Sequence, residues 1–171
     1  SYGLNSGDFH AENIRHGNGE IHFDFIAPDG RIDDINIGVP VEINIENGVA
    51  ALAACWLTGD IEPEKAKEAM SSFMGPKRRF EFRLKEPGSQ GRAIIDDYAH
   101  HPDELKASIT SVKALYPDRR LTVVFQPHLY TRTRDFADGF ADALSHADEV
   151  ILTDIYPARE LPIEGVTSMT R

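Results

Sequence analysis

Apolar and polar residues alternate strictly near the start of the chain. Ile21, Phe23 and Phe25 are separated by polar residues, and a Pro-Asp-Gly sequence at residues 28–30 follows them. This alternation is typical of a strand that buries one face, and the Pro-Asp-Gly sequence is typical of a tight turn. The first part of the chain is therefore expected to form short strands, including a β-hairpin.

The spacing changes to that of a helix from Asn44 onward. Four apolar residues recur at helical spacing: Val49, Leu52, Ala53 and Trp56. Gly59 follows them as the expected end of this helix. A second helix is expected within residues 60–73, where Pro63 stands near the first turn and glutamates alternate with lysines.

A Gly-Pro pair followed by three cations, residues 75–79, interrupts this pattern and is typical of a hinge between domains. A regular series of strands and helices comes after it. The strands are expected at residues 80–84, 93–96, 121–125 and 150–153, and the helices at residues 103–115 and 134–144. The second of these helices is expected to bury one face, formed by Phe136, Phe140 and Leu144.

The last two expected strands, LTVVF and VILT, are continuous apolar runs. Such runs are typical of parallel strands that are covered on both faces. Strands that alternate with helices predict an α/β fold with a doubly wound, mostly parallel sheet.

Composition narrows the function classes. The chain has 171 residues, of which 41% are hydrophobic, enough for one medium domain or two small ones with a packed core. Its net charge of −10 argues against nucleic acid as a partner, and no apolar run reaches the length of a membrane span. The single cysteine, Cys55, is expected in the core and excludes a disulfide framework, so a cytoplasmic setting fits best. We expect a piece of a longer protein, because the first residues begin in mid-sheet and a polar tail ends the sequence.

Polar residues gather where three of the expected strands end, in the sequences DDYAHHP, QPHLYTRTRD and DIYPARE. Ligands of open parallel sheets bind beyond the carboxyl ends of the strands. These three segments therefore predict one binding face, which is expected to include Asp97, Tyr98, His100, His101, His128, Tyr130, Arg132, Arg134 and Arg159.

Two other interpretations of these residues remain open: a purely structural role and a metal site. Asp97 and its neighbours could be turn and cap residues, and His100 and His101 could form a helix entry with Pro102 at the first helical position. The more specific alternative is a metal site formed by both histidines, His128 and an aspartate. Cations disfavour a helix start unless an anion is near, so Arg132 favours a ligand with a carboxylate or phosphate group. The residues alone thus predict an α/β binding domain for a small anionic ligand; no glycine-rich nucleotide motif occurs.

Four motifs, in this order and spacing, resemble the Mur ligases: RRFEF, DDYAHHPDE, FQPHLYTRTRDF and DIYPARE. The resemblance spans nearly the whole chain and is strongest from residue 73 to residue 165. It implies that residues 1–75 end a central ATP-binding domain and that residues 76–171 form most of a Rossmann-like C-terminal domain. The UDP-binding domain, the phosphate-binding loop and most Mg²⁺ ligands are then expected outside this chain.

The activity that the resemblance implies is ATP-dependent joining of L-alanine to UDP-N-acetylmuramate, through an acyl phosphate, in bacterial peptidoglycan synthesis. ATP and Mg²⁺ are the implied cofactors, a homodimer is conceivable, and neither nucleic acid nor a membrane is expected as a partner. One alternative is a recycling ligase that attaches a murein tripeptide to the same sugar nucleotide. A second, from another class, is a non-catalytic nucleotide- or metabolite-binding module, and the fragment alone is expected to be inactive.

The resemblance also assigns roles to individual positions. ATP binding is implied for Asn44, Asn47, Arg79 and Asp97. Substrate binding is implied for Tyr98, His100, His128 and Arg132, of which His100 and Arg132 are also the expected catalytic residues. Two positions depart from the family's pattern: Ile43 stands where a histidine is usual, and Leu129 stands where an arginine is frequent.

Overall fold

The computed structural model describes residues 1–17, 19–59, 61–88 and 91–169. The chain divides into two compact units. Unit 1 contains residues 1–97 and 114–117, and unit 2 contains residues 98–113 and 118–171. In the ranges described, no helix is both long and apolar enough to cross a bilayer.

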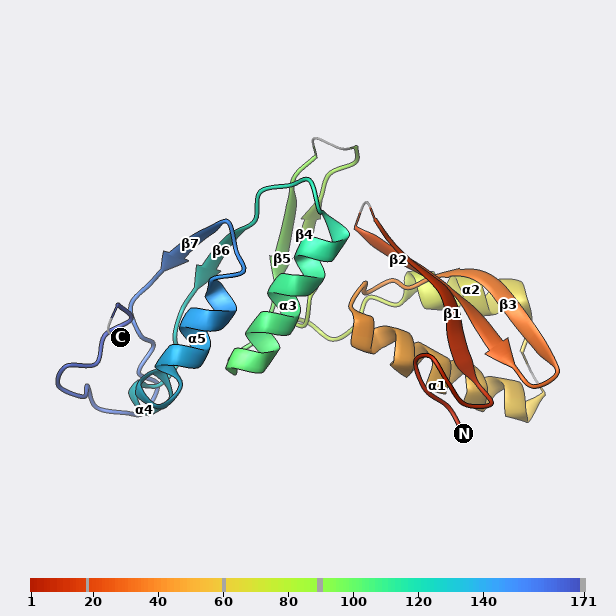
Figure 1. The fold of residues 1–171 in the computed structure, drawn as a ribbon, viewed down its shortest axis with the longest axis horizontal. Helices are drawn as coiled ribbons and strands as arrows, with labels where there is room; N and C mark the ends of the chain where they lie inside the picture. The colour runs from red at the N-terminus through yellow and green to blue at the C-terminus, as the bar shows by residue number, and fades with distance from the viewer. Residues whose placement is uncertain (18, 60, 89–90, 170–171) are drawn as a thin grey trace. The chain divides into compact units, whose positions relative to one another are not determined.

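Unit 1 begins with a three-stranded antiparallel sheet in the order β1-β2-β3 (Figure 1). Its strands are β1 (His10–Gly17), β2 (Glu20–Ala27) and β3 (Gly30–Asn36). The predicted hairpin is confirmed as β2 and β3. Five apolar residues on the inward face are fully buried: Ile21, Phe23, Phe25, Ile32 and Ile35. The first three alternate with polar residues along β2, as the sequence pattern indicated.

Two helices pack against this sheet, α1 (Glu42–Thr58) and α2 (Pro63–Ser72). The predicted apolar stripe of α1 is confirmed, since Val49, Leu52 and Ala53 are buried. Trp56 lies half-buried on Phe25, and its indole N–H donates to Asp29 at 2.8 Å. A Cβ at Gly30 would stand 2.8 Å from the Trp56 ring, so the turn needs glycine there. The prediction that Cys55 is buried was wrong: it lies off the apolar stripe and is exposed.

Unit 1 also contains a pair of strands, β4 (Glu81–Lys85) and β5 (Ala93–Asp96). Both strands were predicted to within a residue or two, and they pair antiparallel. The connection from residue 86 to residue 92 is too short for the crossover that parallel strands require. Before β4, the predicted hinge takes left-handed backbone at Gly75, Arg78 and Phe80, with φ of 66°, 59° and 50°.

Unit 2 has the α/β character that the alternating pattern predicted. Strands β6 (Thr122–Phe125) and β7 (Glu149–Leu152) pair in parallel. The helices are α3 (Pro102–Leu115, whose end falls in unit 1), α4 (Tyr130–Asp135) and α5 (Ala137–Leu144). A core cluster joins them, formed by Leu105, Ile109, Phe125, Phe140, Ala143 and Leu144.

Two details of unit 2 differ from the prediction. The single helix expected at residues 134–144 starts at Tyr130 and is broken at Phe136, whose φ of −118° takes its side chain off the apolar stripe and leaves it 41% exposed. The strands are also not covered on both faces. Alternate residues face the helices, whereas Val124 and Ile151 on the other face are 67% and 48% exposed.

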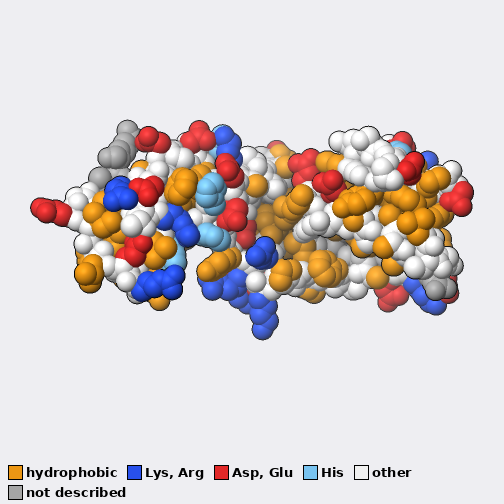
Figure 2. Space-filling view, turned by 90° about the horizontal axis from the view of Figure 1, so that it is seen from below, with side chains coloured by type: hydrophobic (Ala, Val, Ile, Leu, Met, Phe, Trp, Pro, Cys, Tyr) orange, Lys and Arg blue, Asp and Glu red, His pale blue; other side chains and the backbone are white. Residues whose placement is uncertain are grey.

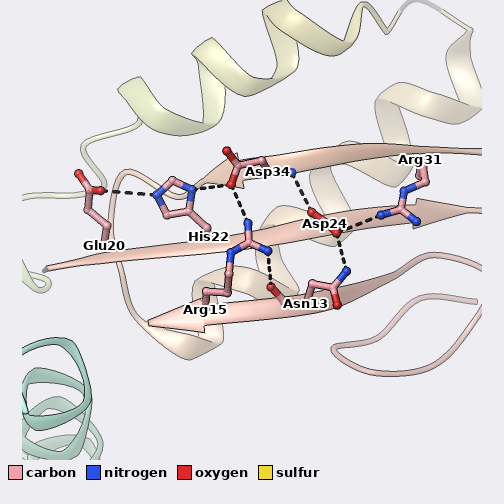
Figure 3. Close-up of polar contacts among 7 residues, drawn as sticks. All are labelled: Asn13, Arg15, Glu20, His22, Asp24, Arg31 and Asp34. Atoms are coloured by element: carbon pink, nitrogen blue, oxygen red, sulfur yellow. Dashed lines mark hydrogen bonds and ion pairs between the residues drawn. The ribbon is translucent and has the colours of Figure 1, made fainter. Parts of the chain in front are cut away.

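The β1–β3 sheet depends on one buried carboxylate, Asp24, which is 5% exposed (Figure 3). It accepts hydrogen bonds from the Asn13 side chain at 2.7 Å, the Arg31 guanidinium at 3.0 Å and the Asp34 backbone N–H at 2.8 Å. Asn13 and Asp34 both have positive φ, 50° and 56°, and lie next to irregular pairings of β1 and β3 with β2. Asp24 therefore satisfies polar groups on both flanking strands.

We predict that Asp24→Ala lowers the free energy of unfolding by about 2 kcal/mol, because three hydrogen bonds to the buried carboxylate are lost, one of them from a charged guanidinium. Burial raises the pKa of Asp24, but the bonds from Asn13, Asp34 and the nearby arginines outweigh it and hold the pKa below its usual 3.8. This contribution is therefore present above about pH 4 and is lost as the pH falls through the folded-state pKa. Denaturant unfolding followed by Trp56 fluorescence measures both effects.

The exposed Asp33, which pairs with Arg31, provides the matched control. Asp33→Ala is expected to change stability by less than about 1 kcal/mol. Equal losses in the two variants would show that the Asp24 network does not hold the sheet.

Candidate functional site

The carboxyl ends of β6 and β7 carry two of the predicted polar segments, and backbone hydrogen bonds tie these segments together. The Leu129 N–H donates to the Tyr156 carbonyl at 2.9 Å, and the Tyr156 N–H donates to the Pro127 carbonyl at 2.8 Å. His128 and Tyr156 form a parallel bridge beyond the strands. The parallel pairing thus continues into the loops and fixes their side chains relative to one another.

A cavity of about 370 Å³ lies at this edge, lined by His128, Leu129, Tyr156, Ala158 and Arg159. The rings of His128 and Tyr156 are stacked, with centroids 5.6 Å apart and an interplanar angle of 20°. Aromatic and aliphatic walls with a few polar groups are typical of small-molecule sites.

Two residues of this cavity have left-handed backbone without being glycine. Leu129 has a φ of 72° and Ala158 has a φ of 52°. Such conformations cost on the order of 1 kcal/mol or more each, and they persist only where the surrounding structure imposes them. Both stand beside the bridged residues, so the strain is concentrated at the walls of the cavity.

Helix α4 begins directly after Leu129 and carries Arg132, and a carboxylate distant in sequence binds its first turn. Glu160 accepts hydrogen bonds from the Thr131 hydroxyl and the Thr131 N–H, the latter at 3.0 Å. These bonds hold the pKa of Glu160 below its usual range. Arg134, on the same helix, is paired with Asp135 at 2.7 Å. Arg132 is half-buried and has no ion pair among the residues that the structure describes.

The histidine pair stands at the start of α3, as the helix-entry interpretation predicted. His101 occupies the N-cap position, since Pro102 is the first helical residue, and its Nδ1 accepts from the Asp103 N–H at 3.4 Å. The Glu104 carboxylate accepts from the backbone N–H of His100 at 3.0 Å and of His101 at 3.3 Å. These bonds satisfy backbone N–H groups at the start of the helix, which have no acceptor within the helix itself.

The bonds of His100 fix which ring nitrogen carries the proton. Its Nδ1 lies 2.9 Å from the Tyr98 carbonyl oxygen, and a carbonyl can only accept, so Nδ1 is the donor. In the neutral ring, Nε2 then keeps its lone pair and can accept a proton. The Tyr98 and His100 rings lie next to each other, with centroids 5.2 Å apart.

The four residues that the resemblance assigned to ATP all lie in unit 1, whereas the four assigned to substrates lie in unit 2. Asn44 and Asn47 lie on one face of α1, where the side-chain N–H of Asn47 donates to the side-chain carbonyl oxygen of Asn44 at 3.3 Å. The Asn44 amide also donates to the Val39 carbonyl at 3.2 Å. Arg79 is exposed within the left-handed hinge, and Asp97 directly follows β5.

Cations without partners stand out in so acidic a chain. Acidic residues outnumber lysine and arginine by 28 to 18, so most cations have a carboxylate within reach. Nevertheless, over the described ranges Arg79, Arg132 and Arg159 make no side-chain ion pair. Figure 2 shows histidine and cationic side chains next to one another on the C-terminal part of the molecule, at the left. A guanidinium group without an ion pair can receive an anionic ligand.

The metal-site alternative gains no support from the described residues, in which no three histidine, cysteine, aspartate or glutamate side chains gather as metal ligands. His100 and His101 use Nδ1 in local bonds, to the Tyr98 carbonyl and from the Asp103 N–H. His128 is stacked on Tyr156 instead.

Several residues of the site were not assigned a role from the sequence. Tyr156, Ala158 and Arg159 line the cavity and belong to the polar segment DIYPARE, which did indicate a binding face. Glu104 stands three residues after the N-cap, which is the spacing of a capping box and could have revealed its role. Glu160 binds Thr131 in the first turn of α4, 29 residues earlier, and no local pattern indicates such a contact.

Comparison with known proteins shows clear similarity. The family model of the Mur ligase, glutamate ligase domain matches residues 78–169, more than half of the chain. A UDP-N-acetylmuramate–L-alanine ligase from Phocaeicola vulgatus is 60% identical over 168 residues, which cover 98% of this chain and 36% of that protein. The ligase of the same name from Parabacteroides distasonis is 60% identical over 161 residues, 94% of this chain and 34% of its own length. The chain thus spans about a third of the curated relatives it matches.

Solved structures of ligases are also similar to this chain. The crystal structure of the UDP-N-acetylmuramate–alanine ligase of Thermotoga maritima matches with a TM-score of 0.74 and 29% identity, over 91% of this chain and 34% of that chain. A folylpolyglutamate synthase from the same organism has a TM-score of 0.71 at 23% identity, over 92% of this chain and 35% of that chain, which shows the shared fold.

We predict that Glu104→Ala weakens the start of α3 and lowers the free energy of unfolding by about 1 kcal/mol, because two backbone donors lose their acceptor. Glu104→Gln keeps an acceptor oxygen and should lose less. Bonds from the His100 backbone, offset in part by burial, lower the pKa of Glu104 from 4.5. The contribution of the ionised Glu104 carboxylate is therefore present above about pH 4.5 and is lost as the pH falls through the folded-state pKa. Denaturant unfolding of the three proteins over a pH series measures this: the wild type should approach Glu104→Gln as the pH falls, and an unchanged gap between these two at the lowest pH at which the protein stays folded would contradict it.

Proposed function

Because the chain belongs to the Mur ligase family, we propose that it is part of an ATP-dependent enzyme that joins L-alanine to UDP-N-acetylmuramate in peptidoglycan synthesis. The observation that supports this most is 60% identity, over 98% of the chain, to a ligase of that name. The site contributes independent support, since free guanidinium groups and a histidine with an available lone pair suit anionic substrates and an amine nucleophile.

We propose two roles for unit 2 in this reaction. ATP supplies the phosphoryl group that converts the sugar's lactyl carboxylate into an acyl phosphate, and the amine of L-alanine attacks that acyl group. The amine must lose a proton to attack, and Nε2 of His100 can accept it because Nδ1 is held by the Tyr98 carbonyl. Arg132, free of ion pairs within the described ranges, can neutralise the negative charge that develops at the attacked carbon's oxygen.

The positions assigned to ATP fit a nucleotide in their chemistry. Asn44 and Asn47 present amides on one helix face, Arg79 presents an exposed guanidinium, and Asp97 presents a carboxylate after β5. Amides suit the edge of a base, a guanidinium suits phosphates, and a carboxylate suits ribose hydroxyls. We therefore propose these four as ATP contacts, and residues 1–75 and 76–171 as the end of an ATP-binding domain and most of a C-terminal domain. A Mg²⁺ ion in this reaction would draw its ligands mainly from outside the chain.

The test is substrate-dependent phosphate release by the complete enzyme, with L-alanine and a murein tripeptide compared as amine donors. Release with L-alanine is the expected result. Release with the tripeptide alone would assign the protein to recycling, and release with neither donor would contradict an enzymatic role. The 171-residue chain alone should release no phosphate, because no phosphate-binding loop sequence occurs in it.

We predict that Arg132→Ala in the complete enzyme costs about 3 kcal/mol of transition-state stabilisation, or roughly two orders of magnitude in kcat/KM. Arg134→Ala is the matched control, because Arg134 lies on the same helix but is already paired with Asp135. Steady-state kinetics with L-alanine measures both variants. An unchanged kcat/KM for Arg132→Ala would remove Arg132 from the proposed site.

A further inference from the structure

Two of the residues proposed as ATP contacts lie at one end of the β4–β5 strand pair. Glu81 pairs with Asp96 in an antiparallel register, so the residues before Glu81 and after Asp96 are at the same end of the pair. Arg79 is two residues before Glu81, and Asp97 directly follows Asp96. An interaction that fixes this end of the strand pair therefore fixes the backbone of both proposed contacts.

Ion pairs join the two strands at this end. The Arg83 guanidinium lies 3.1 Å from a Glu81 carboxylate oxygen on its own strand and donates to Asp96 on the opposite strand at 3.0 Å. The Glu81 and Asp96 side chains are 20% and 34% exposed, so solvent screens these contacts only in part. The strand pairing is irregular between Phe82 and Leu84, which makes Arg83 the additional residue of a β-bulge. A bulge redirects a side chain, and here it brings one guanidinium to a carboxylate on each strand.

The other carboxylate oxygen of Glu81 binds the backbone of the hinge. It accepts a hydrogen bond from the Arg78 N–H at 2.8 Å, and Arg78 has a left-handed φ of 59°. This conformation is unfavourable for a residue other than glycine and persists only where the surroundings impose it. Phe80 is also left-handed, with a φ of 50°, and is buried. Arg79 thus stands between one residue that Glu81 binds and another that is held by burial.

We propose that Glu81 and Arg83 are positioning residues for ATP. Together with Asp96 they form a network that holds the backbone of Arg79 and Asp97 in fixed relative positions before the nucleotide binds. The inference rests on the proposed function, in which Arg79 contacts phosphates and Asp97 contacts ribose. An ordered binding segment loses less conformational entropy when its ligand binds, so loss of the network should weaken ATP binding.

Calorimetric titration of the complete protein with MgATP alone measures this affinity without turnover. We expect Arg83→Met, which removes the guanidinium and keeps a long side chain, to raise the Kd for ATP about 5- to 20-fold. Arg83→Lys should recover part of this loss, because it keeps the positive charge without the planar fork. A merely structural ion pair would lower the melting temperature and leave ATP binding unchanged, so an unchanged Kd for Arg83→Met would overturn the proposal.

The other end of the same strand pair provides a matched control. Arg92 lies 2.8 Å from Glu86 there, in an ion pair of the same kind. Arg92→Met should leave the Kd for ATP within about twofold of wild type, because it loosens the strand pair away from the proposed contacts. An equal loss of affinity in Arg83→Met and Arg92→Met would overturn the proposal. If Arg83→Met does not fold, Asp96→Asn breaks the same network with little change of shape and takes its place under the same criteria.

A double-mutant cycle with Arg79→Ala identifies the route by which Arg83 acts. If the network acts by placing Arg79, its loss matters little once the Arg79 guanidinium is gone. Arg83→Met should then raise the Kd of the Arg79→Ala protein by less than about twofold. Full additivity of the two substitutions would show that Arg83 acts independently of Arg79 and would overturn the proposal.

Steady-state kinetics of the complete enzyme separates failure of this inference from failure of the proposed function. Arg83→Met should raise KM for ATP and leave KM for L-alanine and UDP-N-acetylmuramate within about twofold of wild type. If wild type binds ATP but releases no phosphate with L-alanine, the proposed reaction fails, whereas weaker ATP binding by Arg83→Met still supports the positioning role. A wild-type protein that binds no ATP would overturn both.

Discussion

The candidate site depends on the parallel pairing of β6 and β7. Backbone hydrogen bonds between Leu129, Tyr156 and Pro127 continue this pairing beyond the strands. Parallel strands bring their carboxyl ends to one edge, and the two additional bonds carry that register into the loops. The stack of His128 on Tyr156 and the left-handed backbone at Leu129 and Ala158 all follow from this junction. The energy stored in those conformations is offset by the core beneath, where Phe125, Phe140 and Leu144 are buried together.

The unpaired charges at the candidate site are positive, although the net charge of the chain is negative. An acidic chain repels anions at long range, yet its local contacts leave Arg132 and Arg159 without ion pairs in the described structure, while Arg134 and Glu160 are paired or capped. A guanidinium that has no carboxylate partner within the protein keeps its donors available, so an anionic ligand can form charge-assisted hydrogen bonds with it.

Periodicity predicted most of the elements because their burial is decided by local alternation. The hairpin of β2 and β3, the stripe of α1 and the parallel strands of unit 2 are of this kind. Contacts between distant residues were not predictable in the same way. The break at Phe136 and the early start of α4 accompany a cap from Glu160, and the exposed Ile151 reflects which face of the sheet the helices cover. The polar segments at this edge were predicted because polar residues follow apolar runs in the sequence, whereas the set of residues that line one cavity could not be predicted from the sequence alone.

A crystal structure of the complete protein with the alanine-containing product of the proposed reaction tests most directly whether this edge of the sheet is the substrate site. The expected result places the alanyl carboxylate in the cavity beside His128 and Tyr156, within hydrogen-bonding distance of the guanidinium of Arg159 or Arg132. A product bound elsewhere, with the cavity empty and both guanidinium groups in solvent, would contradict the assignment of this edge to substrate binding.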